Sequence, residues 1–273
     1  MVKDLREEFP SLIDRAYKEY MKQFRLVENI MSKDVTTISP HDSMAEAVKE
    51  MGEKHIGSLI VMVSGKPAAI VTERDLLSKV LAQGKDPKTV TIGEVMSTPL
   101  ITINPKATIK EAAQTMIKKK GRLVVFDDRK LVGIVTAADL IRSLPEIPET
   151  MLTVDEIMTK DVVTCEDEAT VENVAKLMGS ERIGSVIVNR RKKPFSIFTE
   201  RDLLTSFLAR GESLDTKVGN AASSPLITIP SGTSVHSAAY TMVLKHVRRL
   251  PVVKDEKIVG IVTARDLVEA YAK

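Results

Sequence analysis

Apolar residues recur along the chain with two kinds of spacing, one typical of helices and one typical of strands. Between residues 44 and 51 the apolar side chains recur at steps of three and four, which predicts an amphipathic helix. Two apolar runs of strand length follow, residues 58–63 and 68–71, and the polar residues 64–67 between them predict a turn. A short extended segment, residues 35–38, precedes the helix, so the expected order begins strand, helix, strand, strand.

The motif Thr-Glu-Arg-Asp-Leu-Leu closes this series and predicts the start of a second helix. It begins at Thr72 and returns letter for letter at Thr199, with looser copies at Thr136 and Thr263, so the step is nearly constant. A constant step of this kind is the mark of a repeat architecture. The offset from Thr72 to Thr199 equals the offset from Thr136 to Thr263, which predicts a tandem of two-repeat modules.

Each repeat therefore predicts an α+β unit with the order strand, helix, strand, strand, helix. One such unit is too small to bury its own sheet well, so the units are expected to pair. We expect the repeats at residues 27–84, 91–144, 154–211 and 216–273. Residues 145–153, with two prolines among acidic residues, are the expected linker between the modules.

Residues 1–26 stand outside the repeats and predict an amphipathic N-terminal helix. Its apolar positions are Leu12, Ile13, Ala16, Tyr17, Tyr20, Met21 and Phe24. Such a helix packs on its own module, or it meets a partner or a second copy of the chain.

Composition narrows the function classes. The 273 residues include 40 Lys and Arg and 37 Asp and Glu, and this net charge of +3 is too balanced to argue for nucleic acid or membrane. The basic run 190–193 is expected to be a solvated hairpin loop. A single cysteine, no apolar run of about 20 residues and a charged N-terminus predict a cytoplasmic protein without a signal peptide.

Four repeats of this length and order, each ending in a small residue, two apolar residues and Thr-x-x-Asp, resemble cystathionine β-synthase (CBS) domains. The resemblance covers nearly everything from residue 27 onward. It implies that the repeats pair into two Bateman modules, whose clefts can hold adenosyl ligands. The layout is similar to that of the γ subunit of AMP-activated protein kinase. Whether the two modules close into one disc within a chain or between chains stays open.

The Thr-x-x-Asp segments are the first candidate site. The resemblance implies that their carboxylates accept ribose hydroxyls, and that their threonines lie where free amides at a helix start favour phosphate. These residues are Asp75, Asp139, Asp202 and Asp266, with Thr72, Thr136, Thr199 and Thr263. The same pairs are plausible capping boxes, and both roles can coexist. Two other candidate boxes, Ser43 with Glu46 and Thr108 with Glu111, use Glu instead of Asp.

Basic residues just before the second strand of each pair are the candidate phosphate ligands implied by the resemblance. They are His55, Lys120, Arg122, Arg182, His246, Arg248 and Arg249. Arg122 and Arg249 fall at matching positions of repeats two and four, so the clefts that receive them are expected to be the better phosphate sites. The alternative is that these side chains lie in water at a strand edge.

The base slot is expected where the first strand of each repeat ends. Its candidates are Thr37, Ile38, Thr102, Ile103, Thr164, Cys165, Thr228 and Ile229. The repeats differ elsewhere: Gly133 and Gly260 match Ala69 and Ser196, and residues 221–222 replace a methionine. These departures leave open that some of the four clefts are empty or structural.

No nucleophile–base pair, glycine-rich phosphate loop or metal-ligand spacing is found in the sequence. We therefore expect a non-enzymatic regulatory protein with no obligatory cofactor and no metal. It would bind AMP, ADP or ATP, with S-adenosylmethionine and NAD as further candidates, and act through a homodimer or another protein partner. The alternatives are an assembly module with vestigial clefts and a nucleic-acid-binding protein, for which affinity would fall steeply with salt.

Overall fold

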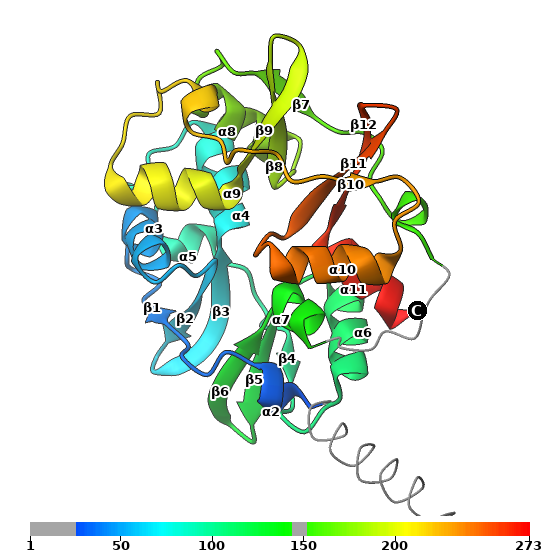
Figure 1. Ribbon diagram of the computed structural model, residues 1–273. Helices are drawn as coiled ribbons and strands as arrows, with labels where there is room; N and C mark the ends of the chain where they lie inside the picture. The colour runs from blue at the N-terminus through cyan, green and yellow to red at the C-terminus, as the bar shows by residue number, and fades with distance from the viewer. Residues whose placement is uncertain (1–25, 144–151) are drawn as a thin grey trace, which may run out of the picture.

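The computed structural model describes residues 26–143 and 152–273. Figure 1 shows four small sheets, two at the bottom and two at the top, with most of the helices between them. All but the last residue of the helix expected over residues 1–26, and most of the linker 145–153, lie outside the described residues.

The first repeat begins with a short helix, α2 (Val27–Ile30), that the sequence did not predict, and then has the predicted order of elements. Its last helix is built from short α, π and 3-10 turns. Its elements are α2 (Val27–Ile30), β1 (Thr37–Ile38), α3 (Met44–Glu53), β2 (Ser58–Val63), β3 (Lys66–Thr72), α4 (Glu73–Asp75), η1 (Leu76–Val80) and η2 (Leu81–Gln83). The turn between β2 and β3 consists of Ser64 and Gly65 alone, so it is shorter than predicted. Both residues take positive φ, 49° and 74°, as in a type I′ hairpin.

The other repeats follow the same plan. Repeat two has α5 (Ile92–Val95), β4 (Thr102–Ile103), α6 (Ile109–Lys119), β5 (Leu123–Asp127), β6 (Lys130–Val135) and α7 (Ala137–Arg142). Repeat three has η3 (Val154–Glu156), β7 (Thr164–Glu166), α8 (Val171–Ser180), β8 (Ser185–Arg190), β9 (Lys193–Thr199), α9 (Glu200–Asp202), η4 (Leu203–Phe207) and η5 (Leu208–Arg210). Repeat four has η6 (Val218–Asn220), β10 (Ile229–Pro230), α10 (Val235–Leu244), β11 (Arg249–Lys254), β12 (Lys257–Thr263) and α11 (Ala264–Ala272).

Every repeat forms its own three-stranded sheet, in the order first, second, third strand. The first strand pairs parallel with the second, and the second pairs antiparallel with the third. The helix between the first two strands makes this parallel pairing possible, because a parallel pair needs a crossover connection. The predicted α+β class is confirmed.

Local sequence signals fix the helix ends. Both candidate boxes with Glu are confirmed: the Ser43 amide donates to Glu46 Oε2 at 2.7 Å, and the Thr108 amide donates to Glu111 Oε2 at 2.8 Å. These bonds lower the pKa of both Glu side chains. The second helix of repeat one ends at Gly84, whose φ of 65° is the left-handed conformation expected there.

Within each module, the segment that precedes the first strand of one repeat forms an isolated β-bridge with the third strand of the other repeat. The amides of Ser97 and Ile70 each donate to the other's carbonyl, at 2.8 and 3.0 Å. In the corresponding bridges, Met31 lies against Gly133 and Met158 against Gly260. A methionine on one repeat is thus matched by a glycine on its neighbour, which explains why these two positions lack a side chain.

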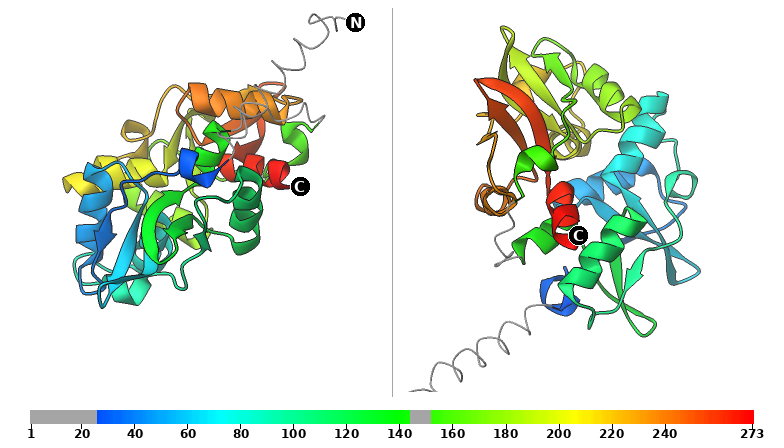
Figure 2. Two further views of the ribbon diagram at one scale, coloured as in Figure 1. Left: turned by 90° about the horizontal axis from the view of Figure 1, so that it is seen from below. Right: turned by 90° about the vertical axis from the view of Figure 1, so that its right-hand side faces the viewer.

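The two modules close on each other within one chain. Leu204 of repeat three is buried in the core of repeat one, and Leu77 of repeat one is buried in the core of repeat three. Repeats two and four share a single core, where α6 packs on α11 and the Gln114 amide donates to the Ala272 carbonyl at 3.4 Å. The result is a closed ring of four repeats, seen from two further sides in Figure 2.

Candidate functional site

Each Thr-x-x-Asp segment closes a third strand and opens a helix as a capping box. In repeat one, Asp75 Oδ2 accepts from the Thr72 amide at 2.9 Å and from Thr72 Oγ1 at 2.6 Å. The other three repeats show the same pair of bonds. The capping role that the sequence left open is therefore present in all four copies.

This capping leaves one oxygen of each aspartate for other partners. A carboxylate oxygen offers about two acceptor positions, and both positions of Oδ2 are taken by the threonine. If these carboxylates accept ribose hydroxyls, as the resemblance implies, Oδ1 is the oxygen that remains available for them. Asp75 and Asp139 are buried, and Asp202 and Asp266 are half-buried.

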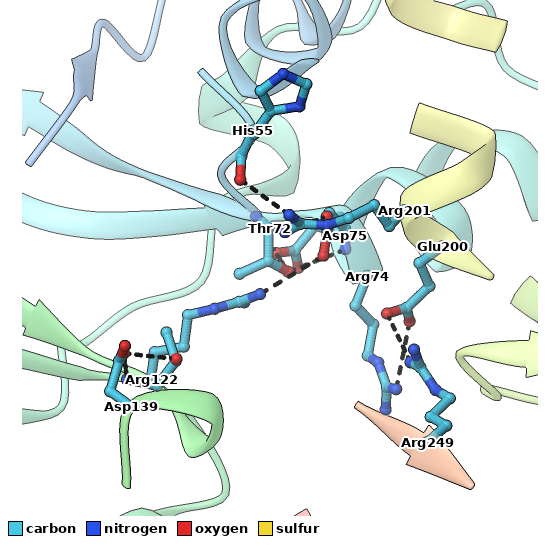
Figure 3. Close-up of polar contacts among 11 residues, drawn as sticks. His55, Thr72, Arg74, Asp75, Arg122, Asp139, Glu200, Arg201 and Arg249 are labelled. Carbon is cyan, nitrogen blue, oxygen red and sulfur yellow. Dashed lines mark hydrogen bonds and ion pairs between the residues drawn. The ribbon is translucent and has the colours of Figure 1, made fainter. Parts of the chain in front are cut away.

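A cluster of arginines and glutamates lies where the four repeats meet (Figure 3). Glu73, only 4% exposed, takes an arginine from each of two other repeats: Arg122 Nη2 at 3.8 Å and Arg201 Nη2 at 3.4 Å. Arg201 also donates to the His55 carbonyl at 2.9 Å. Because Arg201 belongs to the second module, this contact joins the two modules.

The second module has the equivalent arrangement, in which Glu200 takes the place of Glu73. Figure 3 shows the Glu200 carboxylate paired with the guanidinium groups of both Arg74 and Arg249, which lie 3.4 and 3.3 Å from it. Arg249 comes from the same module as Glu200, and Arg74 comes from the other. Each glutamate thus binds one arginine within its module and one across the ring.

Small residues make room for these pairs. A Cβ atom at Gly57 would lie 2.5 Å from Glu73 Oε2 and 3.0 Å from Arg122 Nη2. A Cβ atom at Gly184 would overlap Arg249 Nη2. These two glycines are therefore required at their positions by the ion pairs they border.

Arg248 adds a positive charge that the cluster does not neutralise. Its guanidinium has no hydrogen bond or ion pair to any residue in the described parts of the chain. Arg248 is exposed, yet nearby protein atoms and the neighbouring Arg201 lower its pKa to about 10. It stays charged at neutral pH. The central cluster, defined as Arg74, Arg122, Arg201, Arg248, Arg249, Glu73 and Glu200, thus holds five guanidiniums against two carboxylates.

Four other predicted phosphate ligands lie elsewhere. His55, Lys120, Arg182 and His246 occupy equivalent positions just after a helix, where all four take left-handed backbone angles between 53° and 58°. All four side chains are exposed. No described hydrogen bond or ion pair joins these four side chains to the central cluster. The one described bond from these residues to the cluster is made by the backbone carbonyl of His55, which accepts from Arg201.

The base-slot candidates alternate along their strands. The threonines Thr37, Thr102, Thr164 and Thr228 are exposed, Ile38 and Ile229 are buried, and Ile103 and Cys165 are half-buried. Burial raises the pKa of the Cys165 thiol to about 11, so the thiol stays protonated at neutral pH. A groove beside Thr37 and Ile38 is lined mainly by charged side chains.

The sequence did not point to Glu73, Arg74, Glu200 and Arg201 as parts of a site. One signal was present: repeats one and three carry Glu directly after the threonine, whereas repeats two and four carry Ala. In the described parts of the chain, no three His, Cys, Asp or Glu side chains gather in a way that could hold a metal ion.

The sequence matches the CBS domain at residues 27–82, 92–146, 154–209 and 218–273. The chain therefore belongs to the CBS domain family. An uncharacterized protein of Methanopyrus kandleri is 37% identical over 137 residues, 49% of this chain and 68% of that protein. The CBS domain-containing protein YhcV of Bacillus subtilis is 36% identical over 115 residues, 42% of this chain and 81% of YhcV.

Among solved structures, the fold is similar to that of protein MJ1225 of Methanocaldococcus jannaschii, which has been proposed as an archaeal homolog of g-AMPK. The TM-score is 0.75 at 22% identity, with 90% of this chain and 100% of that chain covered. This likeness confirms the four-repeat fold. None of the helices in the described segments combines the length and apolar character needed to cross a bilayer.

Proposed function

We propose that the protein is a regulatory sensor that binds an adenine nucleotide, AMP, ADP or ATP, between its paired CBS repeats. One observation carries the proposal: the central cluster holds five guanidiniums against two carboxylates, and Arg248 has no described carboxylate partner. Phosphate oxygens are strong acceptors for such guanidiniums and would supply the missing negative charge. Membership of the CBS domain family supports the adenosyl part of the ligand.

Binding would produce a signal through competition for the same arginines. A phosphate group that approaches the cluster offers Arg122 and Arg249 an alternative to Glu73 and Glu200. Those two glutamates also bind Arg201 and Arg74 across the ring, so the contact between modules depends on the ligand. A ligand that binds two arrangements differently shifts the balance between them. A partner protein or a second copy of the chain would read that shift.

The proposal assigns the protein no catalytic step and places it in the cytoplasm. A reducing compartment suits a chain with one cysteine and no internal disulfide.

A thermal-shift screen tests the proposal, because a ligand that binds only the folded state raises the melting temperature. AMP, ADP, ATP, adenosine, S-adenosylmethionine, NAD, GMP and inorganic phosphate would be compared at millimolar concentration. We expect AMP, ADP or ATP to raise the melting temperature more than adenosine or phosphate alone. No rise with any adenosyl ligand would overturn the proposal. If inorganic phosphate raised the melting temperature equally, the cluster would be a site for anions in general and not for a nucleotide.

A further inference from the structure

We propose that the second module, repeats three and four, supplies the carboxylates that bind ribose, and that ion pairs close the equivalent carboxylates of the first module. The inference rests on the proposed function and states which clefts carry it. Its basis is the state of Oδ1, the one oxygen that capping leaves available on each of the four aspartates.

In repeat one, Oδ1 of Asp75 is fully engaged. Lys79 Nζ lies 2.7 Å from it and Ser97 Oγ donates to it at 3.1 Å, which fills both acceptor positions. Lys79 is itself held by the Val95 carbonyl at 2.6 Å and by Ser97 Oγ at 3.2 Å. A ribose hydroxyl would have to displace an ammonium group that has three partners.

In repeat two, Oδ1 of Asp139 is bound by the guanidinium of Arg142. The carboxylate is 5% exposed, so this pair is shielded on the aspartate side. A neutral hydroxyl cannot match a charge-assisted bond to a buried carboxylate. Both aspartates of the first module are therefore closed by a cation.

The second module has no such cation among its described residues. Within residues 26–143 and 152–273, Oδ1 of Asp202 accepts only from Ser223 Oγ, at 3.1 Å, and this neutral hydroxyl can rotate away. For Asp266, the described residues offer Oδ1 no hydrogen-bond or ion-pair partner. Burial raises the Asp266 pKa, and its effect outweighs the two Thr263 hydrogen bonds to Oδ2, which lower it.

The sequence itself encodes this difference. At the offset that relates Thr72 to Thr199, Lys79 corresponds to Ser206 and Arg142 corresponds to Glu269. One cation is thus lost and the other is replaced by an anion, while all four aspartates are kept. The contrast follows from residue type, not from the rotamer of one side chain.

The test is isothermal titration of AMP into the full chain and four matched variants. Asp202→Asn and Asp266→Asn are expected to weaken binding at least tenfold or to remove a site. Asp75→Asn and Asp139→Asn are expected to leave affinity and stoichiometry within about twofold, because their Oδ1 atoms do not meet the ligand. Melting temperatures measured without ligand show that each variant is folded.

Exchange of the cations tests the same inference without touching any aspartate. Ser206→Lys with Glu269→Arg should close the second module and weaken binding as the Asp→Asn variants do. Lys79→Ser with Arg142→Glu should open the first module and raise the number of AMP molecules bound.

Failure of the inference can be told apart from failure of the proposed function. If the unmodified chain binds AMP and Asp75→Asn or Asp139→Asn abolishes binding, the assignment to the second module is wrong and the proposed function stands. If the unmodified chain binds neither AMP nor another adenine nucleotide, both fall together.

Discussion

Arg201 Nη2 lies 3.4 Å from Glu73 Oε1, although the two residues belong to different modules. The mirror pair, Arg74 with Glu200, has the same separation of 3.4 Å. Two reciprocal ion pairs thus connect the helix starts of repeats one and three. They join the two modules at the place where the chain keeps an excess of positive charge.

Replacement of Glu73 by Gln should destabilise the free protein and strengthen nucleotide binding. The substitution removes the charge that holds Arg122 and Arg201 but keeps the side-chain volume. We expect a loss of about 1–2 kcal/mol in the free energy of unfolding, less than for a fully buried pair, because Arg201 remains 32% exposed. The released guanidiniums should bind phosphate more tightly. Urea unfolding and AMP titration measure the two effects.

Glu172→Gln is the matched control for this prediction. Glu172 pairs with Lys176 on an exposed helix face, where an ion pair contributes little. Equal stability losses for Glu73→Gln and Glu172→Gln would show that the central cluster has no special role in holding the modules together.

Replacement of Ser196 by Ala should stabilise the protein. The Ser196 side chain is fully buried beside Val188 and Phe198, and its hydroxyl has no hydrogen-bond partner among the described residues. A buried polar group without a partner opposes folding, so removal of the hydroxyl should add about 1 kcal/mol to the free energy of unfolding. Repeat one already carries Ala69 at this position. A melting temperature that falls in Ser196→Ala would mean that the hydroxyl does find a partner.

Replacement of Gly260 by Ala should destabilise the second module. The added Cβ would overlap Met158 Sδ and would lie 3.1 Å from the Thr159 carbonyl oxygen. Overpacking of this kind typically costs about 1–3 kcal/mol. A double-mutant cycle with Met158→Ala measures the clash: the two changes together should cost less than their sum. Strict additivity would contradict the contact.

The contribution of Asp266 to stability should depend on pH. Burial raises the Asp266 pKa above its ordinary value of 3.8, so the folded chain binds more protons than the unfolded chain between those two pKa values. The contribution of Asp266 to stability is therefore present below pH 3.8 and is lost as the pH rises through the raised pKa. Asp266→Asn should remove this dependence of the free energy of unfolding on pH. It should also raise the free energy of unfolding at pH 7, by up to about 1 kcal/mol.

Asp75→Asn is the contrasting variant. It removes the charge that Lys79 holds at 2.7 Å, so it should lower stability at pH 7 by about 1 kcal/mol. Urea unfolding of both variants at pH 7 measures the two effects. Equal changes in the free energy of unfolding for Asp75→Asn and Asp266→Asn would contradict the different states assigned to their Oδ1 atoms.

Much of the fold could be predicted because its signals are local. The apolar run 58–63 is strand β2, Gly84 ends a helix with positive φ, and the boxes at Ser43 and Thr108 form as their spacing predicts. Each signal depends only on near neighbours in the sequence. The constant repeat step then extends the result from one unit to four.

The central cluster could not be predicted in the same way because it depends on ring closure. Glu73 contacts Arg201 only when repeats one and three pack together, with Leu77 in the core of repeat three and Leu204 in the core of repeat one. No local pattern encodes that packing. The contrast between Glu73 and Ala137 in adjacent repeats was the available signal, and it acquires a meaning only when the ring is known.

The most direct test of the central claim is titration of AMP into the Arg248→Gln variant. Arg248 has no described internal partner for its guanidinium, so its removal should leave the melting temperature of the free protein unchanged or slightly raised. If the cluster binds phosphate, affinity should fall roughly ten- to a hundredfold, the loss expected for one hydrogen bond to a charged group. Arg190→Gln is the control, because Arg190 is already paired with Asp167 in repeat three at 2.9 Å and lies outside the cluster. Equal AMP affinity in the unmodified chain and Arg248→Gln would contradict the claim that the excess positive charge at the ring centre binds the nucleotide.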